Sequence, residues 1–377
     1  MRTEKHSVLH LSESFGWSGG AAQLLALSAG LSEAGWDVAI ACPAGGALWN
    51  KARIGKIRVF DFKPFQDYDL RSAWRVSRLI ARERFDVVHA HHPKAHAAGL
   101  LAVRLSGQRP VFVVSRRVSH PMRINIFSRF KYHNSGIDGY AVVAGSVKKI
   151  LADYGVPDRK IEVIYSGVDE NRFHPMEPDK KIMEELRLPD GIPAVGIIGN
   201  FSRDKGQDVF VKAAAEILRS GKKAVFLFAG RDTDSPELKD LAGAAGLAGE
   251  NTRFLGFRED VPNVLSVMKV SVNAALAGEA LSGSIRESMA MEIPVIASDI
   301  SGNGELVRPG ETGALFLPGD WTALSRLLCD FLDHPEKAGE MARNGLDFIK
   351  KNLTVGRMVE HTKEYYSRLM SERMNLT

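Results

Sequence analysis

The feature that most constrains the fold of this 377-residue chain is an alternation of short apolar runs with longer helix-like stretches. Continuous apolar runs of strand length, separated by helices, are typical of buried strands in a parallel sheet. The pattern occurs in two blocks, so it predicts an α/β fold with two doubly wound, Rossmann-like sheets. The expected strands are Val8–Leu11, Val38–Cys42, Ile57–Phe60, Val87–Ala90, Val111–Ser115, Tyr140–Ala144 and Ile161–Tyr165 in the first block, and Val195–Gly199, Ala224–Ala229, Val270–Ala274 and Pro294–Ala297 in the second.

The segment from Asp169 to Pro193 separates the two blocks and lacks their periodicity. Its prolines and charges are typical of a crossing between domains. At about 150 residues per domain, the length also favours two domains. We therefore expect one domain over 1–170 and another over 171–354. Residues 355–377 have a helical pattern with one apolar face, and we expect this helix to pack back on the N-terminal domain.

Composition excludes several classes of protein. Hydrophobic residues make up 45% and charged residues 25% of the chain, a balance that excludes a mainly disordered protein. The two cysteines, Cys42 and Cys329, lie far apart, so neither a disulfide framework nor a zinc ribbon is expected. No apolar run reaches the roughly 20 residues needed to cross a bilayer, and the first residues do not resemble a signal peptide. We therefore expect a cytoplasmic protein.

Charge is distributed unevenly along the chain. The net charge is +5, yet the stretch from Lys63 to Lys131 holds fourteen basic and four acidic residues, a local excess of +10. Such a stretch suggests an anionic partner, which could be a phosphate group, a membrane surface or a nucleic acid. The alternative is a solvated helix face from Arg71 to Arg84. No recognised nucleic-acid motif accompanies the charges, so we do not expect nucleic-acid binding.

Ligands of open α/β sheets bind beyond the carboxyl ends of the strands, so the loops there carry the information about function. The first such loop places Gly19 and Gly20 between a strand and the helix 21–34. Glycines at this point let backbone N–H groups approach an anion at the positive end of the helix. The spacing matches neither the dinucleotide fingerprint nor a Walker loop, and a tight turn is the alternative.

The second loop, 198–206, carries Arg203 and Lys205 just before a helix expected over 208–219. Cations at a helix N-terminus oppose the helix dipole, which is unusual unless they serve an anion. A phosphate could use both charges together with the free N–H groups of the helix. The alternative is a solvated turn.

The third loop gives the strongest signal. Glu279 lies in the loop and Glu287 lies eight residues later, in a helix expected to start near Ser284. Ser282, Gly283 and Ser284 between them offer small side chains and exposed N–H groups. Carboxylates accept hydrogen bonds from hydroxyl groups, so this arrangement suits a polyol ligand.

These motifs, together with Ser288-Met-Ala290 and Pro294-Val-Ile-Ala-Ser298, resemble the signature of the retaining glycosyltransferases of family 4, also called group 1. Other segments resemble the same family in the same order, and the resemblance covers nearly the whole chain. They are Gly19–Gly20, Asp86–His91, Tyr165–Asp169, Gly199–Gly206, Phe254–Val261 and Gly302–Glu305.

The resemblance implies a GT-B fold, in which two Rossmann-like domains with parallel sheets face each other across a cleft. The N-terminal domain would bind the acceptor and the C-terminal domain a nucleotide-sugar donor. Glu287 would hold the ribose and Glu279 a sugar hydroxyl, while Arg203 and Lys205 would neutralise the diphosphate. The implied catalytic residues are Glu279, Arg203 and Lys205; the donor-binding residues are Gly20, Asn200, Ser282, Gly283, Ser284, Glu287, Phe257 and Arg258; the acceptor-binding residues are Gly19, His91, Arg117 and His120.

The family also implies a reaction without a cofactor or a metal, in which the leaving phosphate accepts the acceptor's proton. We therefore name no nucleophile. His89, His91 and His92 could suggest a metal cluster, and strand alternation puts His89 and His91 on one face. No carboxylate accompanies them at ligand spacing, so we expect no metal site.

The chain departs from the family pattern at several positions. Asn200 stands where an Arg is usual, and Arg203 is the candidate to supply that charge. Arg117 stands where a His is usual, which suggests an anionic group nearby. Leu281-Ser282 replaces Phe-Gly, and Glu292 replaces a helix-ending Gly, although Glu is a poorer residue for a left-handed cap.

The resemblance thus implies a retaining, metal-independent hexosyltransferase that uses a nucleotide diphosphate sugar, with a UDP-sugar as the preferred donor. The acceptor would be a glycan or lipid-linked molecule in bacterial cell-surface polysaccharide or lipopolysaccharide synthesis. Arg116–Lys131 mixes cations with Ile124, Ile126, Phe127 and Phe130, so it could contact an anionic membrane surface at the inner face of the cell membrane. A nucleotide-sugar epimerase or phosphorylase of the same fold, or a non-catalytic sugar-nucleotide-binding module, are the alternatives.

Overall fold

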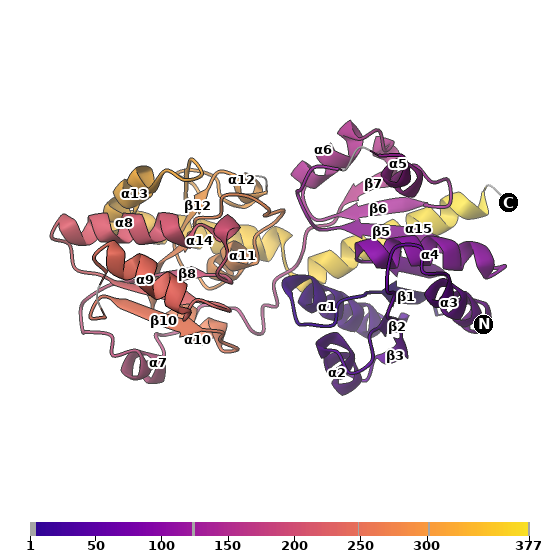
Figure 1. Cartoon of the computed structure of the whole chain (residues 1–377), viewed down its shortest axis with the longest axis horizontal. Helices are drawn as coiled ribbons and strands as arrows, with labels where there is room; N and C mark the ends of the chain where they lie inside the picture. Colours follow the sequence, from indigo (N-terminus) through magenta and orange to yellow (C-terminus); the bar gives the residue numbers. More distant parts are fainter. Residues whose placement is uncertain (1–4, 123–124, 248, 301, 376–377) are drawn as a thin grey trace. The chain divides into compact units, whose positions relative to one another are not determined.

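The computed structural model describes residues 5–122, 125–247, 249–300 and 302–375, without the side chain of Phe127. It contains two compact units, one formed by residues 1–167 with 355–377 and the other by residues 168–354. Each unit is an α/β structure built on one parallel sheet (Figure 1). In the part of the chain that is described, no helix has both the length and the apolarity needed to span a bilayer.

The N-terminal unit contains a seven-stranded sheet in the order β3-β2-β1-β4-β5-β6-β7, with every pair parallel. The central strands are buried over most of their length, which explains their largely apolar sequences. The strands are β1 (Ser7–Leu11), β2 (Asp37–Cys42), β3 (Arg58–Asp61), β4 (Val87–Ala90), β5 (Val111–Arg116), β6 (Gly139–Val142) and β7 (Ile161–Val163). The helices are α1 (Gly19–Glu33), α2 (Ala47–Ile54), α3 (Leu70–Glu83), α4 (Pro93–Leu105), α5 (Ile126–Tyr132), α6 (Gly145–Asp153), the 3-10 turn η1 (Asp158–Lys160) and α15 (Val355–Met374).

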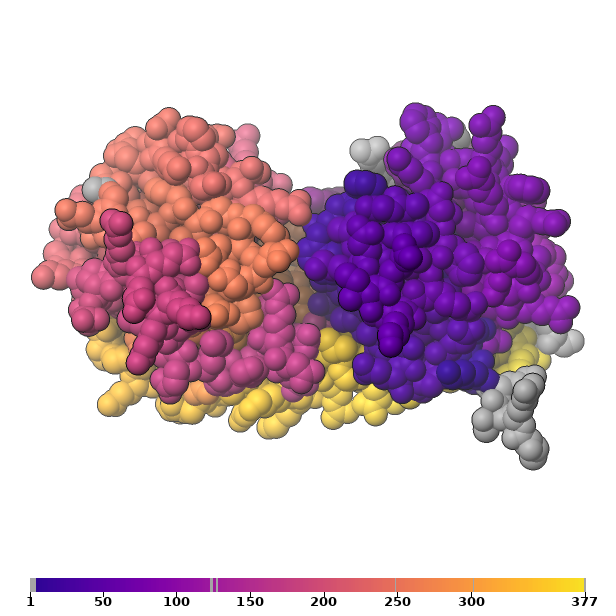
Figure 2. All heavy atoms as spheres, turned by 90° about the horizontal axis from the view of Figure 1, so that it is seen from below, coloured from indigo at the N-terminus to yellow at the C-terminus, as the bar shows by residue number. Residues whose placement is uncertain are grey.

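The helix α15 packs against α1 and β5, so the end of the chain belongs to the N-terminal unit. The hydroxyl of Tyr365 donates to the carbonyls of Tyr140 (3.3 Å) and Lys160 (3.1 Å). A Cβ at Gly139 would lie 1.9 Å from that hydroxyl, so only glycine allows this approach. Figure 2 shows yellow atoms of the C-terminal segment at the edge of the indigo-to-purple surface of this unit.

The C-terminal unit contains a six-stranded parallel sheet in the order β10-β9-β8-β11-β12-β13. Its core includes Phe210, whose ring contacts those of Phe226 and Phe228. The strands are β8 (Ala194–Ile198), β9 (Val225–Ala229), β10 (Thr252–Gly256), β11 (Met268–Asn273), β12 (Val295–Ser298) and β13 (Ala314–Phe316). The helices are α7 (Lys180–Glu185), η2 (Arg203–Lys205), α8 (Gln207–Arg219), α9 (Pro236–Ala244), α10 (Val261–Ser266), α11 (Gly283–Ala290), α12 (Asn303–Leu306), α13 (Trp321–Asp333) and α14 (Pro335–Asn352).

Two of these strands were not expected from the sequence. Strand β10 lies at one edge of its sheet and includes Arg253, so its residues do not form an apolar run. Strand β13 lies at the other edge and has only three residues. Edge strands bury less side chain than central ones, and the run of apolar residues that identifies a parallel strand is therefore weaker there.

In both sheets the strand order reverses next to the first strand of the unit, between β1 and β4 and between β8 and β11. Such a reversal opens a crevice at the carboxyl ends of the two strands, since their following segments diverge to opposite faces of the sheet. The expected functional residues of each unit can therefore be located relative to these two points.

Candidate functional site

In the C-terminal unit, the loop that follows β8 is fixed by Gly206. This glycine has φ +67°, and a Cβ at its position would lie 1.9 Å from the carbonyl oxygen of Ala274, just beyond β11. The N–H of Leu276 donates to the carbonyl of Asp204 at 2.7 Å, which ties the same two loops together. As a result, the N-terminus of α8 lies directly beside the carboxyl end of β11.

Lys205 and Glu279 meet at this point. The ammonium of Lys205 donates to Oε1 of Glu279, and the two side chains are 36% and 14% exposed. The sequence had assigned Lys205 to a diphosphate and Glu279 to a sugar hydroxyl, and the structure brings the two residues together as an ion pair. Arg203 lies two residues before Lys205 in η2 and is exposed.

Asn200 contacts a basic residue that sequence analysis did not single out. Its side-chain oxygen accepts from the backbone N–H of Arg231 at 3.0 Å, and the Arg231 guanidinium lies over the exposed ring of Phe257, 5.5 Å from its centroid. The loop that follows β9 therefore brings the backbone of Arg231 beside Asn200. The only signal in the sequence was a single basic residue after a strand, in Ala229-Gly-Arg231.

The guanidinium of Arg258 is held by two carboxylates. It donates to Asp260 at 2.8 and 2.7 Å and to Glu185 at 2.5 and 3.1 Å. These bonds hold the pKa of the Asp260 carboxyl below its usual range. The side chain of Arg258 is thus engaged within the unit, whereas its neighbour Phe257 is 53% exposed.

The start of α11 is organised by two buried asparagines that sequence analysis missed. The side-chain NH2 of Asn273, at the end of β11, lies 2.9 Å from the Ser282 hydroxyl and 3.4 Å from that of Ser284. Asn303 donates in turn to the side-chain oxygen of Asn273 at 3.3 Å. These bonds occupy and orient the serine hydroxyls, and the first N–H groups of α11, beginning at Gly283, have no partner within the helix. The sequence signal for Asn273 was a polar residue ending an apolar strand.

Glu287 lies in α11 beside the buried Arg286, which is 5% exposed. Burial raises the pKa of Glu287, and the nearby charges of Arg286 and Arg172 oppose this change. Arg286 interacts electrostatically with both Glu287 and Glu279. The two carboxylates named from the sequence therefore share a cationic neighbour, and a partly dehydrated carboxylate gains from hydroxyl donors of a ligand.

In the N-terminal unit, α1 begins directly after the N-cap residue Ser18, whose hydroxyl accepts from the N–H of Ala21 at 3.3 Å. A Cβ at Gly19 would meet no atom within 4 Å, and one at Gly20 would come no closer than 3.8 Å to Ser18 or His92. Packing inside this unit therefore does not require glycine at either position. The space over the helix N-terminus is available to a ligand.

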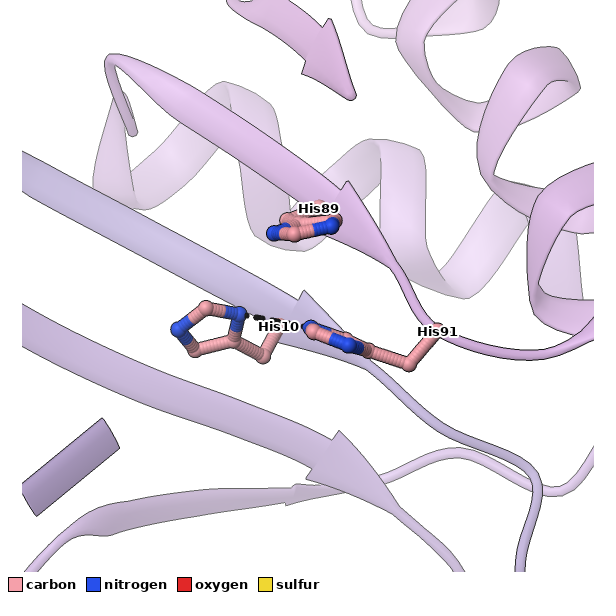
Figure 3. Close-up of side chains that lie close together, drawn as sticks. All are labelled: His10, His89 and His91. Carbon is pink, nitrogen blue, oxygen red and sulfur yellow. Dashed lines mark hydrogen bonds between the residues drawn. The ribbon is translucent and has the colours of Figure 1, made fainter. Parts of the chain in front are cut away.

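Three histidines cluster at the strand reversal of the same unit (Figure 3). His10 of β1 pairs in register with His89 of β4, and His91 follows directly after β4. The rings of His89 and His91 lie 4.1 Å apart, as the alternation in the sequence predicted. The third member is His10 and not His92, whose Nδ1 lies 3.1 Å from the hydroxyl of Ser12.

Hydrogen bonds account for the arrangement of the cluster. His89 lies 2.5 Å from the Tyr366 hydroxyl of α15 and 2.7 Å from that of Ser115. Arg117 lies 3.3 Å from Nδ1 of His91, and a guanidinium can only donate, so His91 accepts there and donates through Nε2 to His10 at 2.9 Å. The sequence had flagged His91 and Arg117, but not His10, Ser115 or Tyr366.

The cluster is uncharged at neutral pH. Burial lowers the pKa of His89 and His91 well below the usual value and that of His10 to about 3. The ligand-type atoms of the three rings lie within 4.8 Å of one another, a grouping that could hold a metal ion. A divalent ion would have to displace the bonds just described beside the cation Arg117, so the geometry fits a hydrogen-bonded cluster better than a metal site.

The remaining acceptor candidate and the expected membrane segment are placed differently. His120 is exposed, and its carbonyl accepts from Arg116. Lys131, expected to be an interfacial cation, is 6% exposed and bonds Asp67 (3.1 Å) and the carbonyl of Pro93 (2.6 Å). That expectation is wrong for Lys131, because internal acceptors take up its charge. Arg123 and Ile124 of the same segment lie outside the described residues.

Comparison with known proteins identifies the family. The family described as "Glycosyl transferases group 1" matches residues 178–348, and "Glycosyltransferase Family 4" matches residues 17–172. The chain belongs to the group 1, or family 4, glycosyltransferases. The resemblance inferred from the motifs is thereby confirmed for both units.

Several family 4 relatives have described activities. An alpha-D-kanosaminyltransferase of Streptomyces kanamyceticus is 30% identical over 189 residues, 50% of this chain and 48% of the relative. The lipopolysaccharide core biosynthesis mannosyltransferase LpcC of Rhizobium leguminosarum bv. viciae is 30% identical over 215 residues, 56% and 60% of the two chains. The matches thus span about half to 60% of these two relatives. A UDP-Gal:alpha-D-GlcNAc-diphosphoundecaprenol alpha-1,3-galactosyltransferase of Escherichia coli is 24% identical over 311 residues, 79% of each chain.

Solved structures confirm the fold class. A glycosyltransferase from Rickettsia africae ESF-5 matches with a TM-score of 0.87 at 21% identity, covering 97% of this chain and 99% of the other. Anabaena Alr3699/HepE, solved in complex with UDP and glucose, matches with a TM-score of 0.83 at 21% identity, covering 96% and 100%. The GT-B architecture of two Rossmann-like units expected from the sequence is therefore correct.

Proposed function

We propose that this chain transfers a sugar from a nucleotide diphosphate sugar to a glycan or lipid-linked acceptor, in bacterial cell-surface polysaccharide or lipopolysaccharide synthesis. The observation that carries the proposal is the gathering of Lys205, Glu279 and Arg286 with Glu287 at the starts of α8 and α11. Together with the helix N-termini, these groups offer cations and N–H donors for a diphosphate and carboxylates for hydroxyl groups.

The diphosphate would take the ammonium of Lys205 and the N–H groups at the start of α8. Lys205 is bound to Glu279 in this structure, so the incoming phosphate exchanges with that carboxylate. Glu279 is then released to accept from a hydroxyl of the donor sugar, while Glu287 accepts from the ribose. This exchange links phosphate binding to sugar recognition within one unit.

Bond cleavage at the donor requires stabilisation of the negative charge that develops on the leaving diphosphate. Preorganised cations and helix N–H groups supply such stabilisation without a metal ion, and Arg203 adds a further charge. For a retaining transfer, the acceptor hydroxyl attacks on the face of the leaving group and its proton passes to the leaving phosphate. No protein nucleophile is then needed, and we assign none.

The acceptor would bind at the N-terminal unit, near Gly19, His91 and Arg117. The hydrogen bond between His10 and His91 leaves Nδ1 of His91 as the acceptor for Arg117. This bond orients the Arg117 guanidinium toward an anionic group on the acceptor. The Escherichia coli relative acts on a diphosphoundecaprenol-linked sugar, which supports a lipid-linked acceptor. The same relative's UDP-Gal and the UDP in the Anabaena complex support a UDP-sugar donor, and the activity would take place at the cytoplasmic side of the membrane.

The test combines calorimetry with product analysis. Lys205→Ala should lower the affinity for UDP by about tenfold to a hundredfold, because a charge-assisted contact contributes about 1.5–3 kcal/mol. Lys212→Ala, on the exposed face of α8, is the matched control and should bind like the wild type. Unchanged UDP, GDP and ADP affinity in Lys205→Ala would refute the donor site. An epimerised nucleotide sugar formed without acceptor would indicate the epimerase alternative instead of transfer.

A further inference from the structure

The helix α3 has two chemically distinct sides. Ala73, Val76, Ser77, Leu79 and Ile80 are buried, and this side packs on α4. The opposite side is solvent-exposed, and its residues recur at the three- and four-residue spacing that keeps them on one face of a helix. They are Leu70 (68% exposed), Trp74 (60% exposed), Arg71, Arg75, Arg78 and Arg82.

Three of these arginines line a groove between α3 and the edge strand β3. The groove has a volume of about 600 Å³, and Arg75, Arg78 and Arg82 share its wall with Phe60 and Asp61. The Nε of Arg82 donates to Glu83 at 2.8 Å. Among the described residues, neither Arg75 nor Arg78 forms an ion pair. The groove therefore has a net positive charge, because Asp61 is the only acid among the described residues that line it, beside three arginines.

Large apolar side chains lie at the N-terminal end of the same face. Phe65 is 84% exposed, and its N–H donates at 3.0 Å to Asp69, the N-cap of α3, which ties Phe65 to the start of the helix beside Leu70 and Trp74. Exposure of Trp, Phe and Leu together is unfavourable in water, whereas these side chains are favoured at the boundary between lipid head groups and acyl chains. Figure 2 looks onto the side of the N-terminal unit on which Figure 1 places α2 and β3.

We propose that this α3 surface, formed by Phe65, Leu70, Trp74, Arg75, Arg78 and Arg82, docks the protein on membranes that contain anionic phospholipids. The arginines of the groove bind lipid phosphates, and the apolar side chains enter the head-group region. The occupant follows from charge complementarity, since the groove is lined by Arg75, Arg78 and Arg82 against one acid, Asp61. The role of docking rests on the proposed function, because a lipid-linked acceptor is reached only at a membrane.

The adjoining apolar residues decide between a lipid surface and a nucleic acid. Arginines alone would suit either polyanion. Aromatic side chains can stack on the bases of a single-stranded nucleic acid, but the exposed aliphatic Leu70 offers no such contact. A bilayer interface, in contrast, buries Leu70 together with Phe65 and Trp74. In the segment 116–131, Ile126 and Phe130 are also exposed, as expected from the sequence, but Lys131 is buried and unavailable to lipid.

The experiment measures co-sedimentation with vesicles of phosphatidylcholine alone and of phosphatidylcholine with phosphatidylglycerol, over a series of salt concentrations. The wild type should bind only with phosphatidylglycerol and should dissociate as salt rises. The triple variant Arg75→Ser, Arg78→Ser, Arg82→Ser should lower the partition coefficient on the order of a hundredfold, at about fivefold per cation. Trp74→Ser should weaken binding at every salt concentration, because it removes an apolar contact.

The matched control removes three exposed cations elsewhere. Arg343→Ser, Lys350→Ser and Lys351→Ser on α14 change the net charge equally and should bind like the wild type. Equal losses in both triple variants would overturn the proposal in favour of non-specific attraction. Wild-type protein that stays in the supernatant at low salt with phosphatidylglycerol would also overturn it.

Two further arms separate other ligands. Displacement from vesicles by soluble glycerol phosphate would indicate a site for a free phosphate, and retention on an oligonucleotide but not on vesicles would indicate a nucleic acid; either result contradicts the proposal. Thermal melting should be the same for both triple variants. UDP affinity measured by calorimetry should be unchanged in both, so a failure of docking and a failure of the proposed donor site remain distinguishable.

Discussion

Replacement of His96 by Phe should reduce the loss of stability that the protein suffers in acid. His96 lies in α4 and is 1% exposed, with its ring edge-on to Tyr132 at 5.1 Å and 6.3 Å from Phe112. Burial lowers the pKa of His96 well below the usual value. The native protein therefore keeps this ring neutral at a pH where the unfolded chain already binds a proton there.

The sign and size follow from this difference in proton binding. A histidine whose pKa is lowered by folding contributes its full stability above the unfolded value of about 6.5, and the contribution falls as pH falls through that value. Between pH 8 and pH 5.5, the unfolded state gains about 1.4 kcal/mol from protonation of one such residue. His96→Phe has no proton to bind, so its free energy of unfolding should fall by about 1.4 kcal/mol less than that of the wild type.

The assay is denaturant unfolding at a series of pH values, followed by tryptophan fluorescence. Trp17, Trp36, Trp49 and Trp74 lie in the N-terminal unit and only Trp321 lies in the other, so a Trp321→Phe background restricts the signal to the unit that contains His96. His96→Leu is the second variant, since it removes the same proton site but not the same packing. At every pH, the free energy of unfolding of His96→Leu should be lower than that of His96→Phe by the same amount, because the two variants differ in packing and not in proton binding. A constant difference between wild type and His96→Phe from pH 8 to pH 5 would refute the reasoning.

The remaining predictions concern the C-terminal unit. Glu279→Gln should raise the affinity for UDP, because it releases the ammonium of Lys205, and should lower turnover of the nucleotide sugar; calorimetry and a transfer assay measure the two effects. Glu287→Gln should weaken UDP itself by about tenfold through loss of a charged acceptor, and equal effects in both variants would contradict the division of roles. Glu292 has φ +57°, so Glu292→Gly should raise the free energy of unfolding by about 1 kcal/mol. Gly206→Ala should lower the melting temperature markedly, because its Cβ would overlap the carbonyl of Ala274; an unchanged melting curve would show that the loop can move.

The sheets could be predicted because central parallel strands are largely apolar. Val87–Ala90 and Val111–Ser115 stand out in the sequence for this reason, and the structure pairs these two strands in parallel. The edge strand β10 could not be predicted in the same way, since Arg253 interrupts it. Glu292 is a different case, because the family pattern, which usually has a glycine there, indicated a left-handed residue, and the structure has it.

The candidate site was predictable in its residues but not in its pairings. Lys205 and Glu279 were each named from local patterns, yet they lie 74 positions apart and meet only because α8 starts beside the end of β11. Asn273 and His10 were missed because each is a polar residue within a largely buried strand, and nothing in the local sequence shows which residue of another element it contacts. Family resemblance supplied roles that neither composition nor spacing contained.

The two strand reversals explain why such different chemistry occurs at equivalent places. Each reversal makes neighbours of two strands distant in sequence, so the last residues of both strands converge. In the N-terminal unit the convergent groups are His10, His89 and His91, which remain neutral. Because Nε2 of His91 donates to His10, Nδ1 of His91 is the acceptor for Arg117. In the C-terminal unit they are charged, with Lys205 bound to Glu279. A neutral cluster can be buried fully without a ligand. A charged pair that is partly exposed to solvent can exchange one carboxylate for a phosphate, so only the second arrangement can respond to an incoming diphosphate.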